Sequence, residues 1–325
     1  MRLLVLTDHR GHSSQNSLYT LTRALVAHPE VTEVAVASRG HSANDGFFYR
    51  YDRTELWAHI ADSDFEYQAD AAALLHHVVP VQLADFDGIV LRLPRPIPDG
   101  FFDHLRAEYD ESRISNRPSG IERTGTKAFL LHFPELCPPM QLVHSLEEID
   151  RVRKLYPVVL KPLEEYGGRG LVRIDGNRVW EGTTEMRLDA FYQKYRDTEI
   201  EYLATRYLKN VSQGDKRIIM AGDRVLAATL RLPAEGSWLC NIAQGGRAVI
   251  TPPTDFELHI AATIAPVLTE HGIVLYGFDT LMDDDGRRIL SEINTLSIGG
   301  IAPYVAETGD RIDRVAAEAL IRALQ

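Results

Sequence analysis

Three oxygen-bearing side chains in the C-terminal part of the chain could hold a magnesium ion. Asp279 lies in one apolar run, and Glu292 and Asn294 lie in the next. Because side chains alternate along a strand, Glu292 and Asn294 share one face. The Asp-Asp-Asp-Gly segment at 283–286 predicts a hairpin turn between the runs, which we expect to be an ordinary solvated loop. Magnesium binds through one or two carboxylates together with nucleotide phosphates, so the pattern predicts a magnesium site.

A lysine followed by glycines could bind phosphate. Lys161 lies at the end of the apolar run 158–162, and Gly167, Gly168 and Gly170 follow it. A lysine at a strand end can reach a phosphate as a point charge. Adjacent glycines let backbone N–H groups approach phosphate oxygens and give a lid its mobility. The alternative is a surface lysine followed by an ordinary hairpin turn.

Two arginines on consecutive apolar runs could point into a cleft. Arg217 follows Asp215 and Lys216 and begins one run, and Arg231 lies in the next, at 227–232. Arginine neutralises the charge that builds up during phosphoryl transfer. The alternative is that Asp215 and Lys216 form a plain turn.

Other catalytic motifs are rejected. Residues 120–127 read G-x-x-x-x-G-T-K, which reverses the last two positions of a P-loop and does not follow a buried strand. Cys137 and Cys240 lack the close spacing of a zinc site, and we expect two reduced, buried thiols. The sequence contains no G-x-S-x-G motif and no paired Cys/His signal for a covalent nucleophile.

The composition is that of an ordinary globular protein with an acidic balance. The chain has 325 residues, of which 45% are hydrophobic and 25% charged, so two or three lobes are expected. Asp and Glu outnumber Lys and Arg by 46 to 35, and the resulting net charge of -11 repels nucleic acid. The first apolar run, 3–6, is too short for a signal peptide, and no run approaches membrane-spanning length. We therefore expect a cytoplasmic protein without nucleic-acid or membrane partners.

The elements that position these residues are expected to begin with an α/β unit. Apolar runs at 3–6, 31–37 and 86–92 predict strands, and leucines between 18 and 25 lie on one helical face. This order predicts a doubly wound parallel sheet at the N-terminus. The loop 8–16 is then a candidate wall of a ligand site, because such sheets place ligands at the carboxyl ends of their strands.

Two capping boxes predict where later helices begin. Ser145 and Glu148 fit the pattern, and so do Thr254 and Glu257. The first of these helices should bury three apolar residues, Ile149, Val152 and Leu155. The polar stretch 113–125 is interpreted as the end of the first domain.

As an ordered set, these segments resemble the ATP-grasp region of bacterial glutathione synthetase. The shared pattern is K-P-L…G-G-x-G, G-D-K-R, an arginine strand, N-x-x-x-G-G-R, G-F-D and E-I-N. Asn116-Arg117-Pro118 is similar to the N-[KR]-P segment that precedes the nucleotide domain of the family. The resemblance implies an α/β ATP-grasp fold behind an N-terminal doubly wound parallel-sheet domain. The implied domains are residues 1–118, a small lid-bearing subdomain at 119–204 and a C-terminal subdomain at 205–325.

The resemblance also implies ATP and Mg²⁺ as cofactors, with Mn²⁺ as a possible substitute, and a role for each matching residue. The residues implied to bind the nucleotide are Lys127, Lys161, Gly167, Gly168, Gly170, Tyr207, Leu208 and Lys216. Those implied in the transfer site are Arg217, Arg231, Asn241 and Arg247. Those implied to bind the metal are Asp279, Glu292 and Asn294.

The implied reaction joins a carboxylate to an amine, as glutathione synthetase does with γ-glutamylcysteine and glycine. The carboxylate takes the terminal phosphoryl group of ATP, and a closed lid keeps water from the acyl phosphate until the amine attacks. The expected partners are a small-molecule carboxylate and amine, and the resemblance implies a homo-oligomer. Two alternatives stay open: an ATP-grasp kinase that phosphorylates a small molecule, and a non-catalytic nucleotide-binding protein.

Two segments depart from the family on the substrate side. Leu239 stands where an arginine is usual, in a lid that carries less glycine than is typical. Leu93 and Pro94 follow Arg92, where the family typically has a Lys-Asp pair. A glutathione-synthetase-like ligase for another substrate pair is therefore an open alternative.

Overall fold

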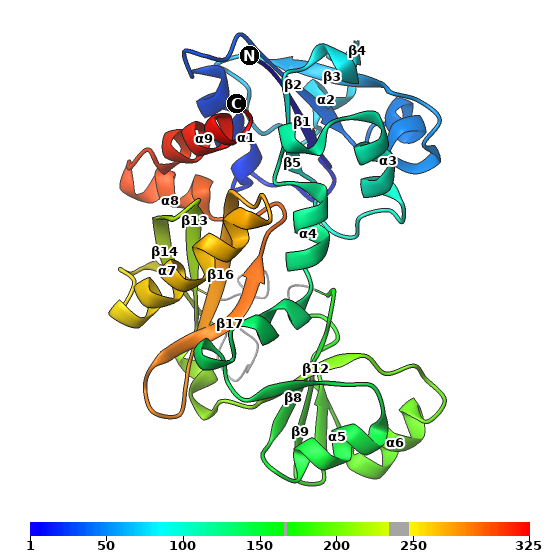
Figure 1. Ribbon diagram of the computed structural model, residues 1–325, viewed down its shortest axis with the longest axis vertical. Coiled ribbons are helices and arrows are strands. Elements are labelled where there is room, and N and C mark those ends of the chain that lie inside the picture. Colours follow the sequence, from blue (N-terminus) through cyan, green and yellow to red (C-terminus); the bar gives the residue numbers. More distant parts are fainter. Residues whose placement is uncertain (166–167, 234–246) are drawn as a thin grey trace.

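A computed structural model describes residues 1–165, 168–233 and 247–325 of the chain. The strands form three sheets, which follow one another along the long axis of the molecule, with the C-terminal sheet in the middle (Figure 1). Their strand orders are β4-β3-β2-β1-β5-β6, β11-β10-β9-β8-β12-β7 and β15-β14-β13-β16-β17. Within the described part of the chain, no helix is long and apolar enough to cross a membrane.

The N-terminal sheet is mixed and mostly parallel. Its strands are β1 Arg2–Thr7, β2 Glu33–Ser38, β3 Glu55–Ala61, β4 Val79–Gln82, β5 Gly88–Arg92 and β6 Ile114–Ser115. The pairs β1–β2, β1–β5 and β5–β6 are parallel, as predicted, whereas β2–β3 and β3–β4 are antiparallel. The predicted strands at 3–6, 31–37 and 86–92 are confirmed. The antiparallel strands β3 and β4 add an edge that the sequence patterns did not reveal.

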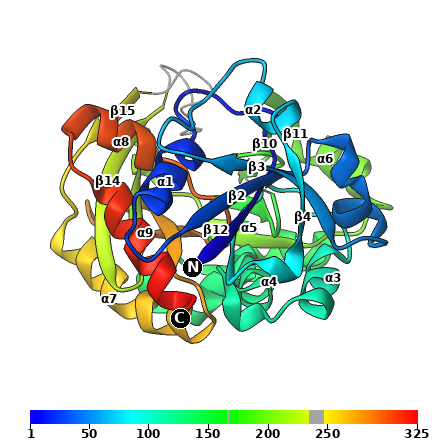
Figure 2. The same cartoon turned by 90° about the horizontal axis from the view of Figure 1, so that it is seen from above.

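Helices cover both faces of this sheet. They are α1 Ser17–Val26, α2 Ala72–Leu75, α3 Phe101–Glu108, α8 Ile301–Thr308 and α9 Ile312–Ala323. Leu3 and Val5 pack in the core that contains α1 and α9, and Leu4 and Leu6 pack in the core that contains α3. Figure 2 shows α1 and α9 on one side of the strands and α3 on the other. Burial on both faces explains why β1 is apolar at four consecutive positions, 3–6.

The second sheet is antiparallel and is covered on one face. Its strands are β7 Met140–Val143, β8 Val158–Pro162, β9 Val172–Asp175, β10 Arg178–Glu181, β11 Thr184–Arg187 and β12 Tyr202–Arg206, and its helices are α5 Leu146–Arg153 and α6 Leu188–Tyr195. Val158 and Leu160 pack against these helices. Alternation therefore directs Val159 and Lys161 to the opposite face, toward the third sheet. The predicted domain boundary at 204/205 falls inside β12.

The third sheet is also antiparallel. Its strands are β13 Asp215–Ala221, β14 Arg224–Leu232, β15 Arg247–Ile250, β16 Leu275–Met282 and β17 Arg288–Asn294, and it is packed against α7 Asp255–Glu270. The predicted hairpin is confirmed, because β16 and β17 pair directly. The capping box of Thr254 and Glu257 forms fully at the start of α7. At the start of α5, Ser145 caps the helix as predicted, but the Glu148 carboxylate accepts from the His144 backbone N–H, at 2.7 Å.

One prediction about local burial is wrong, and another holds only in part. Leu155 is 74% exposed instead of buried, because α5 ends at Arg153 and the residue lies beyond the amphipathic face. The turn at 283–286 is exposed as predicted at three of its residues, Asp284, Asp285 and Gly286, but not at the first. Asp283 is buried, and its carboxylate accepts from the backbone N–H groups of Asp285 and Arg287, at 3.0 and 2.7 Å. The turn thereby gains a fixed shape, and it contacts the segment that follows β12.

Helix α4 (Pro118–Thr124) joins the first sheet to the rest of the molecule (Figure 1). It includes Gly120, which confirms that this glycine does not belong to a P-loop after a strand. A Cβ at Gly120 would lie 1.9 Å from the His271 carbonyl oxygen, so the glycine permits close packing of α4 on the end of α7. Just before α4, the buried Asn116 side chain donates to the carbonyl oxygens of Leu275 and Thr295, at 2.8 and 2.7 Å. The first sheet is thus fastened to β16 and to the end of β17.

Candidate active site

A cavity of about 420 Å³ lies on the face of the third sheet that is turned away from α7. Four segments form its walls: the strands of the third sheet, the glycine-rich loop after β8, the loop after β5 and the loop after β17. Six of its lining residues were predicted from the sequence, namely Gly168, Arg217, Arg231, Asp279, Glu292 and Asn294. The fold therefore brings together residues that are as far apart in the chain as Gly168 and Asn294.

Strand register explains this convergence. The antiparallel pairing places Arg217 beside Asp279, and Asp279 beside Glu292. On the other side of β13, Asp215 lies beside Arg231. Residues directly opposite each other on neighbouring strands project from the same face of a sheet. One face of the third sheet consequently carries acidic and basic groups from four adjacent strands.

The charged side chains of this face form one hydrogen-bonded network. Arg217 donates to both carboxylate oxygens of Asp279, at 2.7 and 2.6 Å. Arg231 donates to both oxygens of Asp215, and its Nη2 also donates to Asp279 Oδ2, at 2.8 Å. In the orientation that satisfies both of its polar atoms, the Asn294 amide donates to Glu292 Oε1 at 3.2 Å and accepts from Arg217 Nη2 at 3.1 Å. Bidentate arginine–carboxylate pairs of this kind fix geometry as well as charge.

The two aspartates of the network differ in their affinity for protons. Burial would raise the pKa of Asp279, but the charges of Arg217 and Arg231 outweigh it and lower that pKa to about 2. Burial and the negative charge of Asp279 raise the pKa of Asp215 to about 6, although Arg231 opposes the rise. Asp279 is therefore a permanent anion at neutral pH, and Asp215 is the member of the pair that takes up a proton as the pH falls.

Two predicted phosphate-binding lysines lie beside this network. Lys161 Nζ donates to the carbonyl oxygen of Ser291 on β17, at 3.2 Å, so its side chain crosses from the second sheet to the third. Lys127 lies in a helical turn at 127–132 and donates to the Glu165 carbonyl oxygen. Burial lowers the pKa of both amines, and the Glu292 carboxylate opposes the shift in each case. A shared anionic neighbour places both ammonium groups near Glu292.

The segment predicted to hold adenine follows β12. Leu208 is buried, and the Tyr207 N–H donates to the Pro157 carbonyl oxygen at 2.7 Å. The guanidinium carbon of Arg173 lies 3.9 Å from the centre of the Tyr207 ring and 4.6 Å from that of Trp180. This stack lies on the face of the second sheet that is directed toward the third sheet. Neither Tyr207 nor Leu208 is among the residues that line the cavity.

Lys216 does not join the other predicted nucleotide-binding residues. It is buried on the opposite face of β13, where its ammonium group donates to the Glu257 carboxylate and to the Pro252 carbonyl oxygen, both at 2.9 Å. The reason is the two-residue period of a strand, which separates Lys216 from its neighbours Asp215 and Arg217. The structure thus gives this lysine an internal partner under α7.

Five further predictions have different outcomes. Arg247 begins the edge strand β15, is exposed and does not line the cavity. Asn241 and Gly167 lie outside the described residues. Gly170 has a φ of +67°, and a Cβ there would lie 2.8 Å from Pro162 Cγ, so the loop after β8 needs glycine at this position. The loop 8–16, predicted as a possible wall, contributes no lining residue of its own.

Asp215, Arg95 and Ser297 are among the cavity-lining residues that the sequence interpretation missed. Asp215 was assigned to a possible turn, although its two-residue spacing from Arg217 would have placed both on one face. Arg95 and Ser297 line the cavity from the loops after β5 and β17, and no local pattern marks them. Across the described ranges, no group of three or more His, Cys, Asp and Glu side chains is arranged to hold a metal.

Comparison with known proteins agrees with this geometry. The family model for the ATP-grasp domain of prokaryotic glutathione synthetase matches residues 126–308. The glutathione synthetase of Mesorhizobium japonicum is 30% identical over 273 residues, which are 81% of this chain and 82% of that protein. That of Prochlorococcus marinus is 35% identical over 225 residues, which are 67% of this chain and 69% of that protein.

Solved structures share the fold over almost the whole chain. D-cycloserine synthetase DcsG superposes with a TM-score of 0.65 at 14% identity, covering 100% of both chains. The ATP-grasp ligase PsnB, complexed with a minimal precursor, Mg and ADP, gives a TM-score of 0.61 at 14% identity, covering 99% of this chain and 97% of PsnB. The mixed N-terminal sheet followed by two antiparallel sheets is therefore an α/β ATP-grasp fold. The chain belongs to the prokaryotic glutathione synthetase family of ATP-grasp ligases, which are ADP-forming carboxylate–amine ligases.

Proposed function

We propose that this protein joins γ-glutamylcysteine to glycine, forming glutathione and converting ATP to ADP and phosphate. The observation that carries the proposal is the cavity of about 420 Å³, in which the arginine–carboxylate network of the third sheet meets the glycine-rich loop. Such a set of groups suits phosphoryl transfer to a carboxylate, which has no need of a covalent enzyme nucleophile. The related glutathione synthetases supply the substrate pair.

ATP would lie between the second and third sheets. Lys161, which reaches the Ser291 carbonyl oxygen across that gap, and Lys127 would neutralise the phosphates, while Gly168 would let the backbone approach them. Tyr207 and Leu208 would contact the adenine at the edge of the gap. Lys216 is left out of this proposed set, because its ammonium group is satisfied on the other face of β13.

Asp279, Glu292 and Asn294 fit a magnesium ion. They offer two carboxylates and an amide oxygen on one face of a hairpin, and magnesium would take the place of arginine donors at the Asp279 carboxylate, which accepts from Arg217 and Arg231 in this structure. Magnesium prefers few protein ligands and completes its coordination with water and phosphate oxygens. When bound with ATP, magnesium would offset the charge of the transferring phosphoryl group. The complex of PsnB with Mg and ADP supports this assignment by analogy of fold.

The arginines would act on the substrate side of the same site. Arg217 and Arg231 would orient the γ-phosphoryl group while the substrate carboxylate attacks it, which yields ADP and an acyl phosphate. The glycine amine would then attack the acyl carbon, and inorganic phosphate would leave. Asp215 accepts from Arg231 Nε and Nη2, so Arg231 keeps a carboxylate partner if its bond to Asp279 is lost.

The test measures glutathione, ADP and phosphate after purified protein is mixed with ATP, Mg²⁺, γ-glutamylcysteine and glycine. We expect the three products in equal amounts. Hydroxylamine in place of glycine should trap the acyl phosphate as a hydroxamate that contains γ-glutamylcysteine. Glu292→Gln, which keeps the shape of the side chain and removes its charge, is the matched control and should give neither product.

The departures at Leu93 and Pro94 define the alternative outcome. If ATP binds but neither glutathione nor the hydroxamate forms, the assignment of γ-glutamylcysteine is wrong. Hydroxamate formation with other carboxylates would then identify the acyl substrate, because the trap requires no knowledge of the amine. Hydroxamate without glutathione would instead retain γ-glutamylcysteine and reject glycine.

A further inference from the structure

The loop after β5 forms the part of the cavity wall that comes from the N-terminal sheet. Pro94 and Arg95 line the cavity together with Asp279 and Glu292 of the third sheet. Under the proposed function, on which this inference rests, the nucleotide occupies the gap between the second and third sheets. The wall at 94–96 is therefore the part of the cavity that the carboxylate substrate meets.

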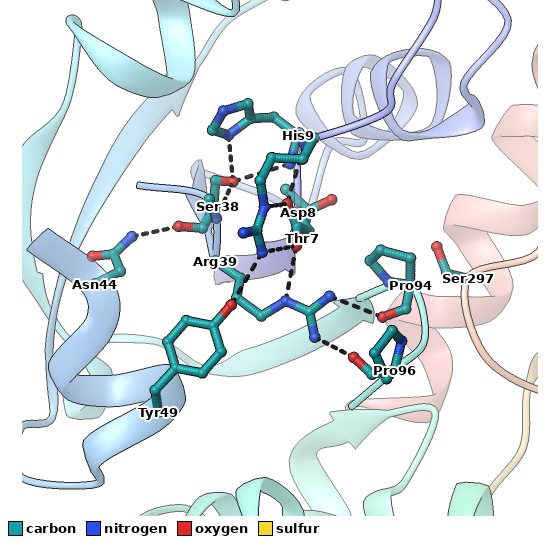
Figure 3. A network of polar contacts seen from close by, with 12 residues as sticks. Thr7, Asp8, His9, Ser38, Arg39, Asn44, Tyr49, Pro94, Pro96 and Ser297 are labelled. Atoms are coloured by element: carbon teal, nitrogen blue, oxygen red, sulfur yellow. Dashed lines mark hydrogen bonds and ion pairs between the residues drawn. The ribbon is translucent and has the colours of Figure 1, made fainter. Parts of the chain in front are cut away.

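A buried arginine outside the cavity holds this wall. Arg39 Nη2 donates to the Pro94 carbonyl oxygen at 3.1 Å, and Nη1 donates to the Pro96 carbonyl oxygen at 2.7 Å (Figure 3). The two acceptors flank Arg95, so a single planar guanidinium fixes the backbone on both sides of that residue. The Arg39 side chain is only 5% exposed, and no part of it lines the cavity.

Asp8 anchors the guanidinium of Arg39 from the opposite side. Arg39 Nε donates to Asp8 Oδ2 at 2.9 Å, and Arg10 donates to both oxygens of the same carboxylate, at 2.8 and 2.6 Å. Burial would raise the pKa of Asp8, but the hydrogen bonds from the two arginines lower it to about 2, so the anchor stays charged. The network joins the carboxyl ends of β1, β2 and β5, which are neighbours in the sheet. Open α/β sheets place ligands at this edge.

Arg95 is the side chain that the fixed wall presents. Its guanidinium donates to the Gly125 carbonyl oxygen at 3.1 Å and lies 3.7 Å from the Glu164 carboxylate. Glu164 is 77% exposed, and exposed ion pairs contribute little free energy, so a substrate carboxylate can replace Glu164 at small cost. Arg217 and Arg231, the cavity-lining arginines of the third sheet, already share the carboxylates of Asp215 and Asp279.

We propose that Arg39 is a positioning residue that holds the wall at 94–96, so that Arg95 receives a carboxylate of the acyl substrate. Arg39 thereby sets the KM for that substrate and leaves the binding of ATP unaffected. A lysine can replace it only in part, because an ammonium group lacks the planar fork that spans the two carbonyl oxygens.

The test compares Arg39→Gln and Arg39→Lys with Arg10→Gln as the matched control. Arg10 contacts the same Asp8 carboxylate but is 57% exposed and does not contact the wall. We expect Arg39→Gln to raise the KM for γ-glutamylcysteine about 10- to 100-fold, with the Kd of ATP within about twofold of the wild type. Arg39→Lys should give an intermediate KM, and Arg10→Gln should leave it unchanged.

Hydrogen exchange supplies a readout that needs no substrate. Leu93 is fully buried at the start of the wall, so its amide should exchange faster in Arg39→Gln and not in Arg10→Gln. Arg95→Gln should raise the KM without changing this exchange, and the double variant Arg39→Gln/Arg95→Gln should be no worse in KM than Arg95→Gln alone.

Several results would overturn the inference. These are an unchanged exchange rate at 93–97, a KM rise in Arg10→Gln as large as that in Arg39→Gln, or equal losses for ATP and for γ-glutamylcysteine. If Arg39→Gln fails to fold, Arg39→Lys, which retains the ion pair with Asp8, decides by the same measurements. If the wild type makes no glutathione, the proposed substrate has failed, and the exchange at Leu93 still decides whether Arg39 holds the wall.

Discussion

Replacing Lys216 by methionine should destabilise the fold and leave nucleotide binding intact. The side chains of Lys216 and Glu257 are 6% and 0% exposed, and their charged groups lie 2.9 Å apart. The variant would remove the ammonium group and leave the Glu257 carboxylate with its bonds from Thr280 and from the Thr254 backbone, at 2.6 and 2.8 Å. Removing one partner of a buried pair costs about 3–5 kcal/mol. These bonds and a third, from the Thr254 hydroxyl at 3.1 Å, place the expected loss near the lower end, at about 3 kcal/mol.

Urea unfolding at neutral pH measures this loss, and calorimetric titration with ATP and magnesium measures nucleotide affinity. Lys161→Met is the matched control, because it removes the same group from the face that is directed toward the cavity. It should weaken ATP binding at least about tenfold and change the free energy of unfolding by less than about 1 kcal/mol. Adding Glu257→Gln to Lys216→Met should recover part of the lost stability, because the uncompensated charge disappears.

The opposite pattern would refute this reasoning. If Lys216→Met lost affinity for ATP and retained its free energy of unfolding, the ammonium group would serve the nucleotide and the buried pair would be incidental. A loss of both quantities that Glu257→Gln did not reverse would also contradict an internal role for the lysine.

Three further outcomes are expected. Glu292→Gln and Asn294→Ala should each lower turnover by several kcal/mol of activation free energy, with unchanged circular dichroism; normal activity in both would exclude the proposed metal site. The pKa of Asp8 is lowered from 3.8 to about 2 in the folded protein, which adds about 2 kcal/mol to the free energy of unfolding above about pH 4. This contribution is lost as the pH falls toward 2, so Asp8→Asn should flatten the pH dependence of urea unfolding between these values. Gly120→Ala should lower the free energy of unfolding by about 3 kcal/mol, because its Cβ would collide with the His271 carbonyl oxygen, and an unchanged melting temperature would contradict that contact.

Six of the fourteen residues that line the cavity could be predicted, because their signals are local. The hairpin of β16 and β17 follows from two apolar runs and a turn, and the period of two then places Glu292 and Asn294 on one face. The same period, applied to β13, would have separated Lys216 from Arg217. This separation was missed because the strand was expected to begin at Arg217, whereas it begins at Asp215.

Other features depend on contacts that leave no local trace. Leu155 fits an apolar helical face, yet the helix stops two residues before it. Asp283 belongs to an acidic turn, yet it is buried where the segment after β12 contacts the turn and the Asn210 amide donates to its carbonyl oxygen. In each case the outcome depends on where an element ends or on which neighbour packs against it.

By itself, the sequence determined the α/β order, the positions of most strands in the ATP-grasp region and the ordered set of charged residues that identifies the family. Alternation and turn chemistry act between near neighbours, so they can be recognised in the chain directly. Only the tertiary structure decided which polar groups become partners. Arg231 donates to Asp215, and Lys216 pairs with Glu257. Arg39 donates to two carbonyl oxygens of the loop after β5. Arg39 and Pro96 are 57 positions apart, and nothing in either local segment specifies the other. Such contacts arise when strands that are distant in sequence become neighbours in a sheet, and their polar groups then require partners inside the fold.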